Sequence, residues 1–148
     1  MMIFDYLDPE LVSFLDVETR EQALATLVET LALHNKLKDK QAFLQAVIDR
    51  EKLVSTGIGA GVAIPHAKLS AYDDFFIAVG ILKKGVEWDA LDGAPVRVIF
   101  MIGGPDDKQT EYLQILSRLT YALKEEDRRK KILQLSSPQE IVDLFNTI

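Results

Sequence analysis

Glu51-Lys-Leu-Val-Ser-Thr-Gly-Ile-Gly-Ala-Gly-Val-Ala-Ile-Pro-His66 is the stretch with the strongest pattern in the chain. Glycine occupies three alternate positions, Gly57, Gly59 and Gly61. Glycine permits sharp turns that bring backbone N–H groups close to an anion. Pro65 fixes its own backbone and favours an extended conformation at Ile64, so that His66 stands on a stiff base. Because a neutral imidazole nitrogen can attack phosphorus near pH 7, the segment suggests phosphoryl transfer at His66.

The composition describes one ordinary globular domain. The chain has 148 residues, of which 48% are hydrophobic and 27% charged, enough to bury a real core. A formal net charge of -6 argues against nucleic-acid and anionic-membrane partners, which usually require a basic face. The chain has no cysteine, and its only histidines are His34 and His66, so that no cysteine site or histidine-rich metal site is expected. Phosphoryl transfer at a histidine requires no metal or bound cofactor, and we expect none.

The N-terminal residues lack the basic and then apolar pattern of a secretory signal peptide. No apolar run reaches the length that is needed to span a membrane, because charged residues or glycines interrupt the longest ones. We therefore expect a cytoplasmic protein that does not insert directly into a membrane.

Apolar periodicity and turn signals predict the order β-αα-βββ-ααα. The predicted strands are 11–15, 62–65, 75–82 and 96–103. The predicted helices are one that begins at Thr19 and ends near His34, and those at 39–52, 112–123, 126–135 and 137–145. Helices before and after a central block of strands indicate a three-layer α/β/α domain with a central mixed sheet, spanning residues 1–148 as a single domain.

Three of these helices begin with recognisable caps. Thr19 with Gln22 forms a capping box in sequence, and Asp39 can cap the second helix. Ser137 precedes a proline at the first helical position and a glutamate, Glu140, which predicts a capping box for the last helix.

Several segments together resemble a known family. The residues that carry the resemblance are 50–51, 55–66, 85–88, 92–96 and 98–102. They are similar to the type-2 enzyme IIA domains of the phosphoenolpyruvate-dependent sugar phosphotransferase system. This is the fructose and mannitol class, which includes the nitrogen-regulatory relatives, and the resemblance covers nearly the whole chain.

The resemblance implies a phosphoryl carrier. In this family a histidine takes a phosphoryl group from the phosphohistidine of HPr and gives it to an enzyme IIB, and His66 aligns with that histidine. Arg50 aligns with an arginine that reaches the site, where a guanidinium can bind phosphoryl oxygens bidentately. Ser55 and Thr56 could add hydroxyl or backbone donors, and the three glycines would complete the phosphate loop.

Two positions depart from the family pattern. Many members carry a second histidine at the start of the third long helix, where this chain has Tyr112. A tyrosine hydroxyl can donate a hydrogen bond to phosphate, but it cannot become cationic. Ala60 stands where relatives often have a polar or acidic residue.

Each candidate also has a purely structural interpretation. His34 lies near a helix C-terminus, where histidine is favourable, and we expect it to be structural or solvent-exposed. Arg50 could pair with an acidic neighbour on its helix, and Tyr112 could be a packed core residue. Trp88 is expected to anchor the core or a strand end. Residues 124–131 mix both signs of charge and are expected to form a solvated helix surface.

Two functional classes remain open from the sequence. The protein could relay phosphate to a sugar-specific enzyme IIB, or it could be a regulatory module whose phosphorylation state controls binding to other proteins. The chain contains no cysteine, no membrane domain and no fused HPr, and it lacks the second histidine, which together favour regulation. A third alternative is a binding domain that has kept the fold and lost the chemistry.

Overall fold

A computed structural model describes all residues, 1–148, as an α/β domain around one six-stranded sheet. The strands are β1 (Val12–Leu15), β2 (Gly57–Gly59), β3 (Val62–Ala63), β4 (His66–Lys68), β5 (Phe76–Val86) and β6 (Val96–Gly104). The helices are α1 (Arg20–Leu33), α2 (Lys40–Leu53), α3 (Gln109–Leu123), α4 (Glu126–Gln134) and α5 (Pro138–Asp143). Short 3-10 turns cover Ile3–Tyr6 and Pro9–Leu11.

The sheet is mixed, as the sequence predicts. Its strand order is β1-β5-β6-β3-β2, and β4 also pairs with β6. Strands β5 and β6 are antiparallel, whereas β1 runs parallel to β5, and both β3 and β4 run parallel to β6. Strand β6 therefore has neighbours along both of its edges.

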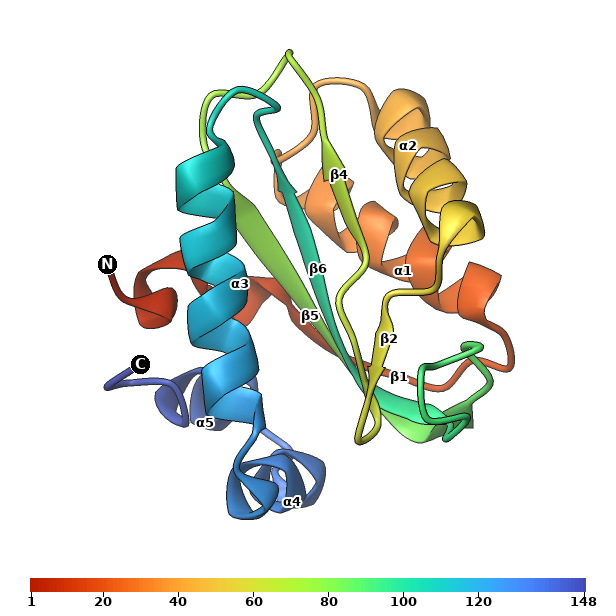
Figure 1. Cartoon of the computed structure of the whole chain (residues 1–148), viewed down its shortest axis with the longest axis vertical. Coiled ribbons are helices and arrows are strands. Elements are labelled where there is room, and N and C mark those ends of the chain that lie inside the picture. Colours follow the sequence, from red (N-terminus) through yellow and green to blue (C-terminus); the bar gives the residue numbers. More distant parts are fainter.

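Helices cover both faces of this sheet (Figure 1). Helices α1 and α2 pack on one face, and α3 and α5 pack on the other. Each face buries its own cluster of 20 hydrophobic residues. These two cores confirm the predicted three-layer, single-domain architecture. None of the helices combines the length and the hydropathy that a membrane-spanning segment requires.

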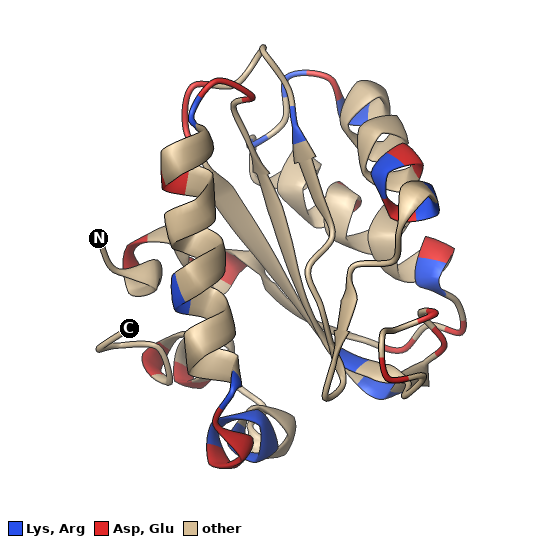
Figure 2. Cartoon of the chain, viewed as in Figure 1, with Lys and Arg blue, Asp and Glu red and all other residues tan.

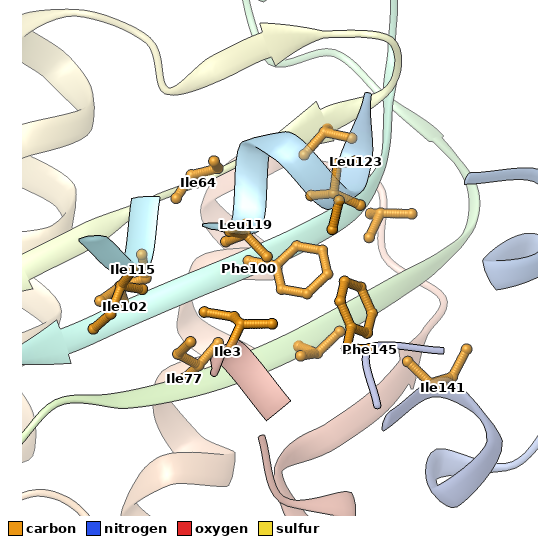
Figure 3. Close-up of a cluster of buried hydrophobic side chains, with 14 of the residues drawn as sticks. Ile3, Ile64, Ile77, Phe100, Ile102, Ile115, Leu119, Leu123, Ile141 and Phe145 are labelled. Atoms are coloured by element: carbon orange, nitrogen blue, oxygen red, sulfur yellow. The ribbon is translucent and has the colours of Figure 1, made fainter. Parts of the chain in front are cut away.

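Strand β6 contributes to both cores because successive side chains of a strand point to opposite faces. Phe100 and Ile102 belong to the cluster beneath α3, whereas Ile99 and Met101 belong to the cluster beneath α1 and α2. Figure 3 shows the first of these clusters, in which the rings of Phe100 and Phe145 meet edge to face at 5.7 Å between centroids. A strand buried on both faces explains the nearly continuous apolar run in the sequence.

The central block contains two more strands than the sequence predicts. The glycine segment forms a short strand, β2, and the expected strand 62–65 stops at Ala63. Pro65 has no N–H to donate to the ladder, so pairing is interrupted there and resumes at His66 as β4. The β2–β3 connection turns through Gly59, Ala60 and Gly61, whose φ angles are 104°, 55° and 78°.

The predicted helix caps are confirmed at two of three helices. The Thr19 and Gln22 side chains form the reciprocal capping box of α1, and the Asp39 carboxylate accepts the N–H of Ala42 in α2. Ser137 is the N-cap residue of α5 and Pro138 its first helical residue, as predicted, but the Ser137 side chain makes no cap hydrogen bond, so the predicted capping box is wrong. This six-residue helix is held instead by burial of its apolar side.

The structural interpretations of His34 and Trp88 agree with the structure. His34 is half-buried at the end of α1, where its Nδ1 lies 2.9 Å from the carbonyl oxygen of Thr30. Trp88 is fully buried in the core beneath α1 and α2.

The charged segment 124–131 is more than a solvated surface. The Arg128 guanidinium donates to the carbonyl oxygens of Ala122 at 2.8 Å and Leu144 at 3.2 Å. Arg129 donates to the carbonyl of Leu123 at 2.6 Å. These arginines satisfy carbonyl groups at the C-terminus of α3 that have no partner inside the helix, and Arg128 ties α3 to the end of α5.

The Arg128→Ala variant should be clearly less stable, because it leaves two carbonyl oxygens without their charged donor. We expect urea denaturation to show a loss of about 2 kcal/mol in the free energy of unfolding. Lys130→Ala is the matched control, since Lys130 makes only an exposed ion pair with Glu126. That control should cost less than about 0.5 kcal/mol. Equal losses in the two variants would contradict the capping role of Arg128.

Candidate functional site

His66 is the first residue of β4 and pairs with Ile102 of β6. Its ring is half-buried, and its Nδ1 lies 3.1 Å from the carbonyl oxygen of Ile64. Because a carbonyl oxygen can only accept a hydrogen bond, Nδ1 must carry the hydrogen. In the neutral ring the lone pair is then on Nε2, which is the nitrogen able to act as a nucleophile.

The surroundings of His66 favour its neutral form. Burial is the largest effect and lowers the pKa of His66 below its ordinary value of 6.5. The hydrogen bond to Ile64 acts in the opposite direction, while the positive charges of Arg50 and Lys68 lower the pKa further. The ring is therefore predominantly neutral, and nucleophilic, at pH 7.

Five of the residues singled out from the sequence lie around one open pocket of about 250 Å³. They are Arg50, Ser55, Thr56, His66 and Tyr112. Ile58, Ile64, Leu116 and Thr120 complete its lining. The pocket is thus formed by the end of α2, the segment from Ser55 to His66, and the side of α3 that carries Tyr112, Leu116 and Thr120.

Arg50 reaches the pocket from the last turn of α2. One of its guanidinium nitrogens, Nη1, donates to the carbonyl oxygen of Val54 at 2.9 Å, which anchors the side chain close to the helix end. A guanidinium carries several further N–H donors in a planar fork that matches phosphate oxygens. Arg50 forms no ion pair, so the alternative of an acidic partner on its helix is wrong.

The hydroxyl groups of Ser55 and Thr56 are already used as donors within the protein. The Ser55 hydroxyl donates to the carbonyl oxygen of Trp88 at 2.7 Å. The Thr56 hydroxyl donates to Glu51 at 2.6 Å, and the Thr56 N–H also donates to Glu51. Since a phosphate oxygen needs a donor, these groups fix the shape of the segment instead of offering hydrogens to an anion.

The three glycines do not line the pocket. Gly57 lies against Ala90 so closely that an added Cβ would stand 2.7 Å from the Ala90 Cβ. Gly59 and Gly61 form the β2–β3 turn, where the N–H of Ala60 donates to the Asp92 carboxylate at 2.9 Å. This hydrogen bond lowers the pKa of Asp92. The turn thus binds an exposed carboxylate of the same chain.

Tyr112 is both a core residue and a neighbour of His66. It is only 5% exposed, and its ring centroid lies 5.5 Å from that of His66 at an interplanar angle of 51°. The Lys68 ammonium lies 4.0 Å from the centre of the tyrosine ring, within cation–π range. Burial raises the pKa of Tyr112, so its hydroxyl keeps its hydrogen at neutral pH.

Two residues near the site had not been assigned a role from the sequence. Lys68 follows His66 by two positions on β4, and alternation along a strand places both on one face. Glu51 is buried beside the pocket, although acidic residues are rarely buried. No group of three or more His, Cys, Asp or Glu side chains is arranged to hold a metal ion.

Residues 5–148 match the family model described as "Phosphoenolpyruvate-dependent sugar phosphotransferase system, EIIA 2". The chain belongs to this family of phosphocarrier domains. It is 39% identical over 134 residues to the fructose-specific EIIABC component of Bacillus subtilis, covering 89% of the chain but only 21% of that relative. It is 36% identical to the fructose-specific EIIA component of Haloferax volcanii, covering 86% of the chain and 82% of the relative.

The same family includes relatives with a regulatory name. A nitrogen regulatory protein of Bradyrhizobium diazoefficiens is 31% identical over 98% of the chain and 95% of that relative. Among solved structures, the nitrogen regulatory protein IIA-Ntr of Neisseria meningitidis matches with a TM-score of 0.89 at 28% identity, over 97% and 98% of the two chains. The mannitol enzyme IIA of Escherichia coli, in complex with phosphorylated enzyme IIB, shares the fold at a TM-score of 0.81 and 22% identity, over 96% and 98%.

The lowered pKa of His66 predicts how the site responds to acid. Protonation removes the nucleophilic lone pair, so phosphoryl uptake should stay constant from pH 7 through 6.5 and decline only below the lowered pKa. The unfolded chain protonates His66 near pH 6.5, whereas the folded protein does so only at a lower pH. The free energy of unfolding should therefore decrease as the pH falls from 6.5 to the lowered pKa. NMR titration of the imidazole should give a pKa below 6.5, rising in Arg50→Ala, and a wild-type pKa above 6.5 would contradict this assignment.

Proposed function

We propose that Nε2 of His66 accepts a phosphoryl group from the phosphohistidine of HPr. The observation that supports this most strongly is the hydrogen bond of 3.1 Å from Nδ1 to the Ile64 carbonyl, which leaves the lone pair on Nε2. The lowered pKa of His66 keeps that lone pair available at neutral pH. We expect the exchange to take place in the cytoplasm.

The transfer is an in-line displacement. The Nε2 lone pair forms a new P–N bond while the P–N bond to the donor histidine breaks and its electron pair returns to the donor ring. Phosphorylation gives the His66 ring cationic character while Nδ1 keeps its hydrogen. The Ile64 carbonyl then receives a charge-assisted hydrogen bond, which stabilises the phosphorylated product.

Arg50 has the position required to neutralise the phosphoryl group. It lines the same pocket as His66, and its positive charge acts on the pKa values of both His66 and Tyr112. Its guanidinium can hold two phosphoryl oxygens at once while negative charge builds up during transfer. Tyr112 contributes a rigid wall on the other side, with its ring against the imidazole.

Enzyme IIB is the acceptor that we propose for onward transfer. The structure of the mannitol enzyme IIA with phosphorylated enzyme IIB provides a precedent for this fold. Residues 57–67 contain no Lys, Arg, Asp or Glu, and Figure 2 shows the strands near the site largely without charge. Ile58, which lines the pocket, is 43% exposed, and Leu113, which follows Tyr112 on α3, is 52% exposed. Exposed apolar side chains of this kind suit transient contact with a partner protein.

The His66→Gln variant tests the assignment directly. It should keep the fold, because the side chain is half-buried at the edge of a pocket, and it should take up no label from phospho-HPr in the presence of phosphoenolpyruvate and enzyme I. His34→Gln is the matched control and should label normally, since His34 lies at the end of α1 and outside the pocket. Acid-labile phosphate in the His66→Gln protein would refute the proposal.

The Arg50→Ala variant should fold and should accept phosphate about 100-fold more slowly, because the charge on the transferring group loses its partner. Arg50→Lys should recover only part of the rate, since an ammonium cannot form the bidentate contact. Stopped-flow or rapid-quench transfer from phospho-HPr measures both. Unchanged rates in Arg50→Ala would remove Arg50 from the site.

The second candidate function is regulation by phosphorylation state without onward transfer. The full-length similarity to nitrogen regulatory proteins supports it, as does Tyr112 in place of a second histidine. Adding a purified enzyme IIB of the fructose or mannitol class to the phosphorylated protein separates the two functions. Rapid loss of label to enzyme IIB would support a transport carrier, and retention of label would support a regulator.

A further inference from the structure

Glu51 is a charged residue in an unfavourable place. It is only 3% exposed and lies in the last turn of α2, which ends at Leu53. The C-terminus of a helix carries partial negative charge, so a carboxylate there opposes the helix dipole. Burial of a carboxylate also costs free energy unless the carboxylate is well hydrogen-bonded. Contacts outside α2 must therefore stabilise the Glu51 carboxylate in this position.

Both oxygens of the Glu51 carboxylate bind a single residue, Thr56. Oε2 accepts the Thr56 backbone N–H at 2.5 Å, and Oε1 accepts the Thr56 hydroxyl at 2.6 Å. Two charge-assisted bonds to one residue fix both the backbone and the side chain of Thr56. The residue at position 56 must supply a hydroxyl as well as an N–H to complete this pair.

A chain of hydrogen bonds continues from Thr56 to the imidazole. The Thr56 carbonyl oxygen accepts the N–H of Ile64 at 3.0 Å, and the Ile64 carbonyl oxygen lies 3.1 Å from Nδ1 of His66. The next carbonyl, that of Pro65, accepts the N–H of Ile102 at 2.9 Å. The Ile64 carbonyl is therefore held from both sides, by Thr56 and by strand β6.

We propose that Glu51 is a positioning residue that acts through Thr56 and Ile64 to hold His66 in its Nδ1–H tautomer. This inference rests on the proposed phosphoryl transfer at Nε2. If the Ile64 carbonyl could rotate, the ring would lose the partner that selects its tautomer, and Nδ1 and Nε2 would share the hydrogen. A fraction of the molecules would then present a protonated Nε2 that cannot attack phosphorus.

The geometry also separates this role from direct catalysis. Glu51 is absent from the lining of the pocket, although Arg50, its neighbour in sequence, lines it. A negative charge in contact with the phosphoryl group would repel it, whereas a buried carboxylate behind Thr56 orients the ring without that repulsion. Glu51 thus holds the ring while Arg50 binds the group that is transferred.

Glu51→Gln is the primary test because glutamine keeps the size of the side chain and replaces one acceptor oxygen by a donor. Thr56→Val is the second variant, since it removes the hydroxyl and keeps the backbone N–H. Asp49→Asn is the matched control: it removes a carboxylate from the same helix, but Asp49 is exposed and accepts only from Gln45. Circular dichroism and thermal denaturation verify that each variant is folded.

Two readouts distinguish positioning from a general structural role. The ring ¹⁵N chemical shifts of unphosphorylated His66 report its tautomer, and the ³¹P and ¹⁵N spectra of the phosphorylated protein report which nitrogen carries phosphate. We expect one Nδ1–H tautomer in the wild type and in Asp49→Asn, and a mixture in Glu51→Gln and Thr56→Val. The two latter variants should also accept phosphate at least about tenfold more slowly, as expected for a displaced reactive group.

The outcomes are separable. Folded Glu51→Gln and Thr56→Val proteins with a single Nδ1–H tautomer would overturn the inference, whatever their transfer rates, because a slower rate alone would show only a structural role. The tautomer measurement does not depend on phosphate. A wild-type protein that takes no label from phospho-HPr would therefore refute the proposed function, while the ¹⁵N spectra would still decide the role of Glu51.

Discussion

The burial of β6 on both faces, with hydrogen-bonded partners on both edges, is the constraint on which the rest of the structure depends. Antiparallel β5 fixes one edge, and β3 and β4 share the other. Pro65 divides that second edge, since it has no N–H for the ladder. The interruption lets the Ile64 carbonyl turn toward the imidazole while Ile102 continues to anchor the chain through the Pro65 carbonyl. The His66 ring is thereby attached to a strand that is buried on both faces and paired along both edges.

Opposite requirements meet at the pocket. An incoming phosphoryl group needs positive charge, whereas a nucleophilic imidazole must avoid taking up a proton. Burial and the neighbouring cations both disfavour the protonated ring, so the charges that would bind phosphate also help to keep the nucleophile neutral. The internal hydroxyl groups are used to shape the backbone, which leaves Arg50 as the principal donor on the pocket wall.

The sequence predicts the fold class well because long elements have strong periodicity. The resemblance to a known family also assigns Arg50, His66 and Tyr112 to one site. The structure places all three around one pocket. Strands β2 and β4 were not predicted, since three-residue strands leave too little alternation to recognise. Strand β4 depends on a partner distant in sequence, β6, whereas β2 pairs only with β3 across the glycine turn.

Other features depend on three-dimensional contacts that a linear pattern does not contain. The charge cluster around Arg128 looks like a solvated surface until its position beside the carbonyl groups of α3 is known. The glycines suggest a loop that binds an external anion. The N–H of Ala60 instead donates to Asp92, a residue about 30 positions away in sequence. A role for Glu51 could have been predicted, because an acidic residue in the last turn of a helix is unfavourable and needs partners outside the helix.

The presence of Tyr112 beside His66 also determines how the pocket responds to pH. A pair of neighbouring imidazoles titrates in coupled macroscopic steps, in which each ring alters the affinity of the other for hydrogen ions. The phenol beside His66 keeps its hydrogen throughout the neutral range, because burial raises its pKa. His66 therefore has no second imidazole beside it with which to couple, and its ring gains a proton only below neutrality, because its pKa is lowered.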